Sequence, residues 1–311
     1  MPRVLLFFVD GVGIGPADDR INPFLRARLP VLSKLLGGIP TLGWLSDSGA
    51  RRSVPTDEHP ASRDIRLLPL DATLGVDGLP QSGTGQISLL TGRNAARMFG
   101  RHFGPWPPVR LRPLLARENV LVRAQEAGLQ VTFANAYPRG YPEKRSGRLV
   151  AAPPLAARAA GLLTRHQQAL AAGEAVASEI VNDGWRRMLG PHRIPEVTPR
   201  EAGSILARLA GEADLTLFAH YSTDLAGHRG GMAGAVKALE RVDRFLGGVL
   251  AALPADVLFL LVSDHGNLED VRGGHTRNPA LGLAAEPLAE HFSARPDLTH
   301  IAPLVLKILG A

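Results

Sequence analysis

Three apolar runs in this chain are each followed closely by side chains that can hold a metal ion or move a proton. The runs span residues 4–9, 215–218 and 257–262. Apolar runs of this length without strict alternation are typical of strands that are buried on both faces of a parallel sheet. Because open α/β sheets build their sites at the carboxyl ends of the strands, we expect the residues that follow to meet at one sheet edge.

The side chains that follow the three runs are aspartates and histidines. In chain order they are Asp10, Asp224, His228, Asp264, His265 and His275, the last of which comes ten residues after His265. Carboxylate and imidazole groups are common ligands of divalent transition metals. Six such groups are enough for two ions, so we expect a two-metal site at this edge of the sheet.

The rest of the chain alternates between segments that favour strands and segments that favour helices. Residues 65–70 favour a strand at a sheet edge, because Pro69 cannot donate a backbone hydrogen bond to a second neighbour. Residues 119–126 favour a helix, residues 130–134 a strand and residues 301–309 a final helix. This alternation predicts an α/β fold with a doubly wound, mostly parallel sheet and helices on both faces.

The segment 138–196 interrupts the alternation. It opens with Pro, Gly and Arg residues, then becomes rich in Ala and Leu with helical character, and it contains no apolar run that resembles a central strand. The alternation resumes at Thr198 and Pro199, an N-cap residue followed by a Pro at the first helical position. We therefore predict a small helical lid inserted into one core domain, which is made of residues 1–137 and 197–311.

Composition limits the chemistry that is open to the chain. Of the 311 residues, 45% are apolar and 21% are charged, which is ordinary for a globular protein. Cys is absent, which excludes disulfides, thiolate metal sites and cysteine nucleophiles. The N-terminal apolar run is too short for a signal peptide, and no run approaches the length of a membrane span. We therefore expect a cytoplasmic protein with no membrane partner.

The formal net charge of +6 comes mostly from Arg residues that are spread along the chain. A nucleic-acid-binding chain usually has a basic stripe with interleaved aromatic residues, whereas aromatic residues are only 5% of this chain. We therefore expect no nucleic-acid partner. A diffuse positive field instead favours a small phosphorylated substrate. The pattern gives no indication of the oligomeric state.

Five short motifs in a fixed order carry a resemblance to a known family. They are Val9-Asp10-Gly11, Gln81-Ser82-Gly83-Thr84-Gly85, Asp224-Leu225-Ala226-Gly227-His228, Ser263-Asp264-His265-Gly266-Asn267 and His275-Thr276-Arg277-Asn278-Pro279. With these motifs the chain resembles the alkaline phosphatase superfamily, in particular its metalloenzyme branch of cofactor-independent phosphoglycerate mutases and phosphopentomutases. The motifs cover both halves of the predicted core. Each of them alone is a weak signal, but five in register are specific.

The resemblance implies a role for each of the metal-ligating candidates. The implied ligands are divided between two ions, with Asp224, His228 and His275 at one and Asp10, Asp264 and His265 at the other. Ser82 is implied to bridge the two ions and to act as the nucleophile. Some of these residues also have plain structural interpretations. Asp224 and His228 are spaced like a pair on one helix face, and His275 lies in a Gly-rich loop where exposed imidazoles are common.

Coordination chemistry agrees with these implied roles. Mixed Asp and His ligands favour Mn²⁺ or Zn²⁺ as the cofactors, with Mg²⁺ as a third option. Two such ions can stabilise both the entering and the leaving oxygen of an in-line phosphoryl displacement. Ser82 lies in a Gly-rich turn just before a short helix, whose N-terminus would favour a phosphate's charge. Thr84 is a rival nucleophile two residues further on, and we favour Ser82 on the motif match.

The size of the insertion bears on the reaction. The mutases of this branch carry a large α/β cap, which helps to keep water away while the intermediate reorients. The insertion predicted here is short and helical, so we expect a metal-dependent phosphomonoesterase that forms a phosphoserine on Ser82. The alternatives are a phosphomutase or phosphotransferase acting on a sugar phosphate or phosphoglycerate, and a non-catalytic member that keeps the fold for binding. A sulfatase is not expected, because the modified cysteine that such enzymes use is impossible here.

Overall fold

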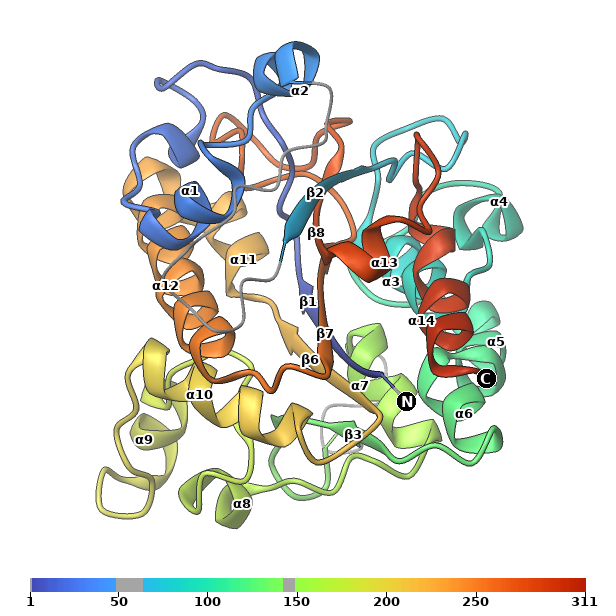
Figure 1. The fold of residues 1–311 in the computed structure, drawn as a ribbon, viewed down its shortest axis with the longest axis vertical. Coiled ribbons are helices and arrows are strands. Elements are labelled where there is room, and N and C mark those ends of the chain that lie inside the picture. The colour runs from blue at the N-terminus through green and yellow to red at the C-terminus, as the bar shows by residue number, and fades with distance from the viewer. Residues whose placement is uncertain (1, 49–63, 142–148) are drawn as a thin grey trace.

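The computed structural model describes residues 2–48, 64–141 and 149–311. Its centre is a six-stranded sheet with the strand order β2-β8-β7-β1-β6-β3 (Figure 1). The strands are β1 (Arg3–Val9), β2 (Ile65–Leu70), β3 (Val131–Phe133), β6 (Leu215–His220), β7 (Val257–Ser263) and β8 (Ala280–Ala285). The four strands from β7 to β3 run parallel, and β8 and β2 add an antiparallel edge.

Helices cover both faces of the sheet, and Figure 1 shows α10 and α12 on one side with α3 and α14 on the other. The first face carries η1 (Pro23–Leu25), α1 (Pro30–Leu36), α2 (Leu42–Ser48), α10 (Pro199–Ala210), α11 (Ser222–Arg229) and α12 (Gly231–Ala252). The second face carries α3 (Ser82–Thr91), α4 (Ala95–Phe99), η2 (Val109–Leu111), α5 (Arg112–Glu118), α6 (Val120–Glu126), α7 (Ala152–Ala159), α13 (Glu286–Ala289), η4 (Leu298–His300) and α14 (Ile301–Leu309).

The central strand β1 explains why its sequence is apolar without alternation. Its side chains alternate between the two hydrophobic cores, with Leu6 and Phe8 in one and Leu5 and Phe7 in the other. All of these side chains are fully buried, because helices cover both faces of the sheet. The predicted fold class, an α/β protein with a mostly parallel sheet and helices on both faces, is therefore confirmed.

Two local expectations differ from the structure. The strand β8 is not anticipated in the sequence, because its residues are Ala, Leu and Gly, which have little preference for strands over helices. The Gly-rich stretch after Gln81 is not a turn before a helix, since helix α3 already begins at Ser82 and continues through both glycines. The predicted edge position of the Pro69 strand is correct, because β2 pairs only with β8 within the sheet.

The described part of the segment 138–196 is mixed in structure. It contains α7, α8 (Gln167–Ala171), α9 (Asp183–Leu189) and a short strand β5 (Val176–Ala177), which pairs with β4 (Asn135–Ala136) outside the main sheet. Helix α7 packs against α3 and α5 and so belongs to the hydrophobic core. The division into a core and an inserted lid remains a prediction.

Two further expectations concern the chain outside the central sheet. The composition of residues 47–64, which has no apolar periodicity, predicts a polar and irregular stretch, and most of it falls outside the described residues. Within the ranges that the structure describes, no helix is both long enough and apolar enough to cross a bilayer.

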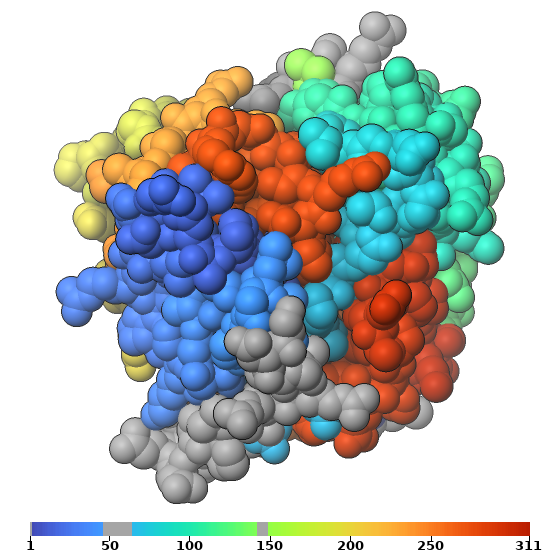
Figure 2. Space-filling model, turned by 90° about the horizontal axis from the view of Figure 1, so that it is seen from above, coloured from blue at the N-terminus to red at the C-terminus, as the bar shows by residue number. Residues whose placement is uncertain are grey.

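The loops after β1 and β7 lie side by side at the carboxyl edge of the sheet. Val9 pairs with Ser263, the last residue of β7, and Leu281 donates a backbone hydrogen bond of 2.8 Å to the carbonyl of Val12. Figure 2, seen from above, shows the orange-red C-terminal part between the blue N-terminal part and the cyan part that follows it. Segments from both ends of the chain therefore meet at this edge.

Candidate functional site

The nitrogen Nε2 of His265 is surrounded by oxygen atoms from three distant parts of the chain and from the neighbouring Asp264. It lies 2.9 Å from the hydroxyl of Ser82 and 3.4 Å from Oδ1 of Asp10. It also lies 3.7 Å from Oδ2 of Asp264 and 4.0 Å from Oδ1 of Asp224. The imidazole and the Asp264 carboxylate are completely buried, so these groups face one another with little water between them.

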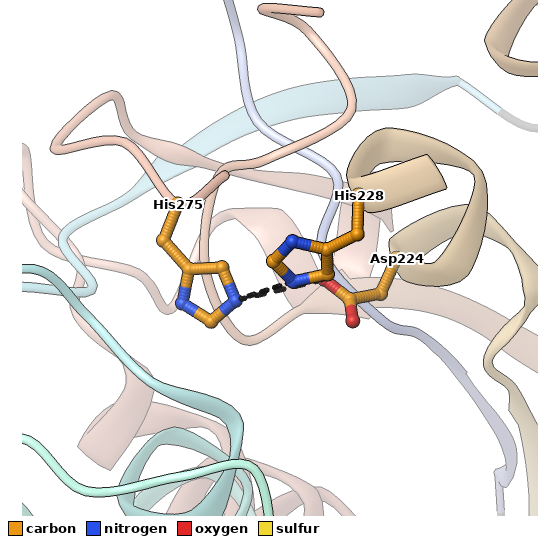
Figure 3. Close-up of side chains that lie close together, drawn as sticks. All are labelled: Asp224, His228 and His275. Atoms are coloured by element: carbon orange, nitrogen blue, oxygen red, sulfur yellow. Dashed lines mark hydrogen bonds and ion pairs between the residues drawn. The ribbon is translucent and has the colours of Figure 1, made fainter. Parts of the chain in front are cut away.

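A second cluster lies beside the first and is shown in Figure 3. Asp224 and His228 lie on one face of α11, and the imidazole of His275 points at them from the loop before β8. The Nε2 atoms of His228 and His275 are 3.1 Å apart. Oδ1 of Asp224 lies 3.5 Å from the first of these nitrogens and 3.8 Å from the second. The spacing of Asp224 and His228 is thus a helix-face pair that faces a third potential ligand.

Two groups of three side chains within the described residues have ligand atoms close enough to share a metal ion. Asp224, His228 and His275 form one group, and their ligand atoms all lie within 4.8 Å of one another. The other group joins Asp10 and His265 to Asp224 under the same distance limit, so Asp224 lies between the two clusters. Asp264, which the resemblance assigns to the second ion, is adjacent to this group through its contact with His265.

The side chain of Ser82 contacts His265, which belongs to the group with Asp10 and Asp224. Ser82 is the first residue of α3 and is 3% exposed. Gly83 allows this position, because a Cβ there would collide with the backbone carbonyl of Trp106. The rival Thr84 points elsewhere, since its hydroxyl accepts a hydrogen bond from the backbone of Phe103 at 3.2 Å and lies near the carbonyls of Gln81 and Phe103. This geometry favours Ser82 as the nucleophile.

Several buried oxygen atoms of the site lack a hydrogen-bond partner. They include Oδ1 of Asp10 and Oδ2 of Asp264, both of which point at His265. Burial and the neighbouring Asp264 hold the pKa of the Asp10 carboxyl well above its usual range, and burial also raises the pKa of Asp264. Orphaned, buried carboxylate oxygens beside imidazoles are what a divalent cation would satisfy. The donor set therefore fits a metal centre.

The pKa values of two imidazoles of the site are shifted in opposite directions. Burial opposes a charged ring at His265, but attraction by Asp264 and Asp10 raises its pKa to about 10. Burial and the nearby His265 lower the pKa of His275 to about 4. Nδ1 of His275 lies 2.7 Å from the carbonyl of Pro80, a contact that places the proton on Nδ1. The Nε2 lone pair of His275 is thereby turned toward His228 and available for a metal.

The loops that carry the candidate ligands are tied together by Glu269, which the sequence analysis does not single out. Its completely buried carboxylate accepts hydrogen bonds from the backbone nitrogens of Gly13 and Asn267, at 2.9 and 2.8 Å. It also accepts hydrogen bonds from the side chains of Thr276 and Asn278, at 2.5 and 3.0 Å. Glu269 therefore connects the loop after β1 with two parts of the loop between β7 and β8, and the second of these parts lies next to His275. Its place two residues after the Ser263–Asn267 motif is the only sequence signal that points to it.

Asn267 lies within one of the recognised motifs and acts on Asp224 directly. Its Nδ2 donates to Oδ1 of Asp224 at 2.6 Å and to the backbone carbonyl of the same residue at 3.1 Å. A hydrogen bond to a ligand carboxylate fixes its orientation, as is usual around metal sites. Asn267 is therefore a positioning residue for the side chain that lies between the two clusters.

The clusters open into a cleft with a volume of about 1230 Å³. Asp10 and Ser82 line one end of the cleft together with Asp224, His228 and His275. Residues from the segment 138–196 also line the cleft. Such a cleft has room for a phosphate group and for a large organic group attached to it.

Comparison with known proteins gives a partial sequence match and a fold match over nearly the whole chain. Residues 192–311 match the family described as the Metalloenzyme superfamily. The chain is 35% identical over 125 residues to the 2,3-bisphosphoglycerate-independent phosphoglycerate mutase of Desulforudis audaxviator, a match that covers 37% of this chain and 25% of that protein. The corresponding mutase of Agrobacterium fabrum is 38% identical over 126 residues, with the same coverage. The chain thus matches about a quarter of the length of these relatives.

Two solved structures share the fold. The PH0037 protein from Pyrococcus horikoshii aligns with 99% of this chain and 97% of its own, at a TM-score of 0.56 and 15% identity. The alkaline phosphatase from the Antarctic bacterium TAB5 aligns with 100% of this chain and 99% of its own, at a TM-score of 0.50 and 12% identity. At this level of identity the likeness concerns the fold alone.

Proposed function

Because the chain belongs to the metalloenzyme branch of the alkaline phosphatase superfamily, we propose that it is a two-metal phosphomonoesterase acting through Ser82. The observation that carries this proposal is the contact of 2.9 Å between the Ser82 hydroxyl and Nε2 of His265, inside a ring of carboxylates. A serine that only begins a helix has no need of a buried histidine at its hydroxyl with two buried aspartates beside that histidine.

The proposed metal ligands are the six residues expected from the sequence. One ion is assigned to Asp224, His228 and His275, and the other to Asp10, Asp264 and His265, with Ser82 between them. The orphaned oxygens of Asp10 and Asp264 support the second assignment. Oxygen and imidazole ligands without thiolate favour Mn²⁺ or Zn²⁺, with Mg²⁺ as a third option. When bound, such ions lower the pKa of a hydroxyl they contact and neutralise charge on phosphate oxygens.

The residues of the chain then have defined tasks in the reaction. The Ser82 oxygen attacks phosphorus, the ester bond breaks, and the alcohol leaves with a proton. Water attacks the resulting phosphoserine, which releases inorganic phosphate and restores the Ser82 hydroxyl. The N-terminus of α3 directs its positive dipole end at the phosphate throughout.

A phosphomutase acting on a sugar phosphate or phosphoglycerate is the second candidate function. The partial match to 2,3-bisphosphoglycerate-independent phosphoglycerate mutases favours it. We favour hydrolysis because the segment 138–196, proposed as the lid, contributes only short helices and the two-residue strand β5 in its described part, and one of these helices, α7, is packed into the core. The described part of this segment is therefore smaller than the large α/β cap with which the mutases exclude water.

Phosphorus NMR separates the two reactions in one experiment. The bound Mn²⁺ is first replaced by Zn²⁺ or Mg²⁺, because Mn²⁺ is paramagnetic and broadens the phosphorus signals. The protein is then incubated with 3-phosphoglycerate, ribose 5-phosphate and simple phosphate esters. A phosphomonoesterase gives a growing signal of inorganic phosphate. Conversion of a phosphate ester to its isomer without free phosphate would instead establish the mutase. If the protein has bound both metal ions and still forms neither product from any ester, the result would contradict the proposed phosphoryl transfer.

A further inference from the structure

The Tyr and Trp residues of this chain are few, and most of them line the candidate site. The chain has three Tyr and three Trp residues. All three tyrosines, Tyr137, Tyr141 and Tyr221, line the cleft that contains Ser82. Two of the three tryptophans, Trp106 and Trp185, line it as well. A distribution of this kind points to a binding role for the aromatic rings beyond filling the core.

The tyrosines form an ordered wall of this cleft. The rings of Tyr137 and Tyr141 are stacked, with their centroids 4.5 Å apart. The hydroxyl groups of Tyr137 and Tyr221 are 3.4 Å apart, so their polar ends contact each other. Burial raises the pKa of both hydroxyls, so both tyrosines remain neutral near neutral pH. The wall therefore offers ring surfaces and no negative charge.

Exposed aliphatic side chains extend this surface around the mouth of the cleft. Leu149 and Met188 are 52% and 58% exposed, and Leu79 and Leu225 are 47% and 55% exposed. All four line the same cleft, although large apolar side chains with this exposure are uncommon elsewhere in the described residues. Exposed apolar side chains that gather at one place usually mark a binding surface.

The described lining residues offer few partners for a second anionic group on the substrate. Among the described lining residues, Arg229 is the one permanently cationic side chain, and Glu179 adds a negative charge. A phosphoglycerate carries a carboxylate in addition to its phosphate, and a sugar phosphate carries several hydroxyls that need hydrogen-bond partners. Binding such groups against aromatic and aliphatic walls would leave them poorly paired.

We propose that the substrate is a phosphate monoester whose alcohol carries an aromatic or similarly bulky apolar group. The phosphate lies at Ser82 and the apolar group lies against the Tyr137 and Tyr141 wall, in the cleft that Met188 and Leu149 also line. This inference rests on the proposed phosphomonoesterase function and adds a substrate class to it. The volume of about 1230 Å³ is several times that of a phosphate group and leaves room for such an alcohol.

The test compares esters whose leaving alcohols have similar acidity, so that intrinsic reactivity does not decide the result. 2-Phenylethyl phosphate is compared with propyl phosphate, glycerol 3-phosphate and 3-phosphoglycerate. We expect kcat/KM for 2-phenylethyl phosphate to exceed each of the others by about tenfold or more, as for other apolar pockets. Equal values, or a preference for glycerol 3-phosphate or 3-phosphoglycerate, would overturn the inference.

A pair of matched variants links the preference to the cleft. Met188→Ser removes an exposed apolar side chain from its rim without leaving an internal cavity, because this residue is 58% exposed. It should lower the ratio of kcat/KM for 2-phenylethyl phosphate to that for propyl phosphate severalfold. Met98→Ser makes the same change on α4, outside the cleft, at a residue that is 49% exposed, and it should leave the ratio unchanged. A ratio that changes equally in both variants would contradict the proposed position of the apolar group.

A binding measurement tests the proposed ligand class independently of whether the protein hydrolyses any ester. 3-Phenylpropylphosphonate and butylphosphonate replace the ester oxygen by a methylene group and cannot be hydrolysed. Calorimetry on the metal-loaded protein should give at least about tenfold tighter binding of the phenyl compound. If no ester is turned over but this preference is found, the phosphomonoesterase proposal fails and the ligand class stands. Equal affinities would overturn the ligand class whatever the activity.

Discussion

The hydroxyl oxygen of Ser82 lies 2.9 Å from Nε2 of His265, although 183 positions separate the two residues in the chain. Helix α3 supplies the first residue, and the loop after β7 supplies the second. Ser82 thereby contacts the group of Asp10, Asp224 and His265, and its proposed role as nucleophile depends on this contact.

Removing the Ser82 hydroxyl should abolish the reaction without unfolding the protein. Ser82→Ala should lower the rate of phosphoryl transfer by several orders of magnitude, because it deletes the attacking oxygen and no core side chain. Mass spectrometry of the acid-quenched wild-type enzyme should find phosphate on the peptide that contains this serine. Thr84→Val is the matched control and should retain activity within about tenfold. Phosphate on Thr84, or an inactive Thr84→Val protein with an active Ser82→Ala protein, would reassign the nucleophile.

Chelation should reduce both activity and stability. With the ions removed, Asp10 and Asp264 face His265 and each other without a compensating divalent charge. Dialysis against EDTA should abolish turnover, and Mn²⁺ or Zn²⁺ should restore it. At ion concentrations of 100 to 1,000 times Kd, metal binding should raise the free energy of unfolding by about 3–4 kcal/mol. Full activity after elemental analysis has shown complete loss of metal would rule out the metal-dependent account.

Glu269 should be required for the geometry of the metal centre. Glu269→Ala leaves four hydrogen-bond donors in or near the buried loops without their acceptor, so we expect a loss of about 2–4 kcal/mol in the free energy of unfolding. Affinity for the metal, measured by calorimetry, should fall in Glu269→Gln, which keeps the shape but turns one acceptor into a donor. Glu126→Ala, at an exposed position on α6, should change neither quantity. Unchanged metal affinity in Glu269→Gln would show that this residue supports the fold alone.

His220 should make the stability of the protein fall in mild acid. Its imidazole is completely buried, with Nδ1 2.7 Å from the carbonyl of Ser178, and burial lowers its pKa to about 4. In the unfolded chain this imidazole takes up a proton near pH 6.5, whereas in the folded chain it stays neutral until about pH 4. The free energy of unfolding therefore decreases as the pH falls from about 6.5 toward 4. Within that window the slope is at most about 1.4 kcal/mol per pH unit.

Urea denaturation at a series of pH values measures this contribution. His220→Asn should have a shallower dependence on pH than the wild type, even if the variant is less stable overall. His192→Asn, which removes an exposed histidine, should keep the wild-type slope. The same slope in wild type and His220→Asn would contradict the role assigned to the buried ring.

The parts of the fold and the site that follow from local patterns were predictable from the sequence. The apolar residues 4–9 and 257–262 mark two neighbouring parallel strands, so Asp10 and Asp264 had to come together at their ends. The final helix is found at Ile301–Leu309, at its predicted bounds. That these side chains bind metal stays a prediction.

Other features depend on packing that no local pattern reports. The first turn of α3 contains two glycines, which disfavour a helix, but the close approach of the backbone at Trp106 requires a residue without a side chain at Gly83. Strand β8 is formed from Ala, Leu and Gly because β2 and β7 provide its neighbours. Glu269 looks like an ordinary loop carboxylate until the loops around it are assembled. The aromatic wall could not be predicted from the sequence either, because Tyr137 and Tyr221 are far apart in the chain.

The most direct test of the two-metal site is anomalous scattering from a crystal grown with Mn²⁺. The account predicts two manganese peaks on either side of the Ser82 oxygen. One should be bound by Asp224, His228 and His275, and it should weaken in His228→Ala crystals. The other should be bound by Asp10, Asp264 and His265, and it should weaken in Asp264→Asn crystals. A single peak, or two peaks whose ligands are divided differently among these residues, would contradict the account.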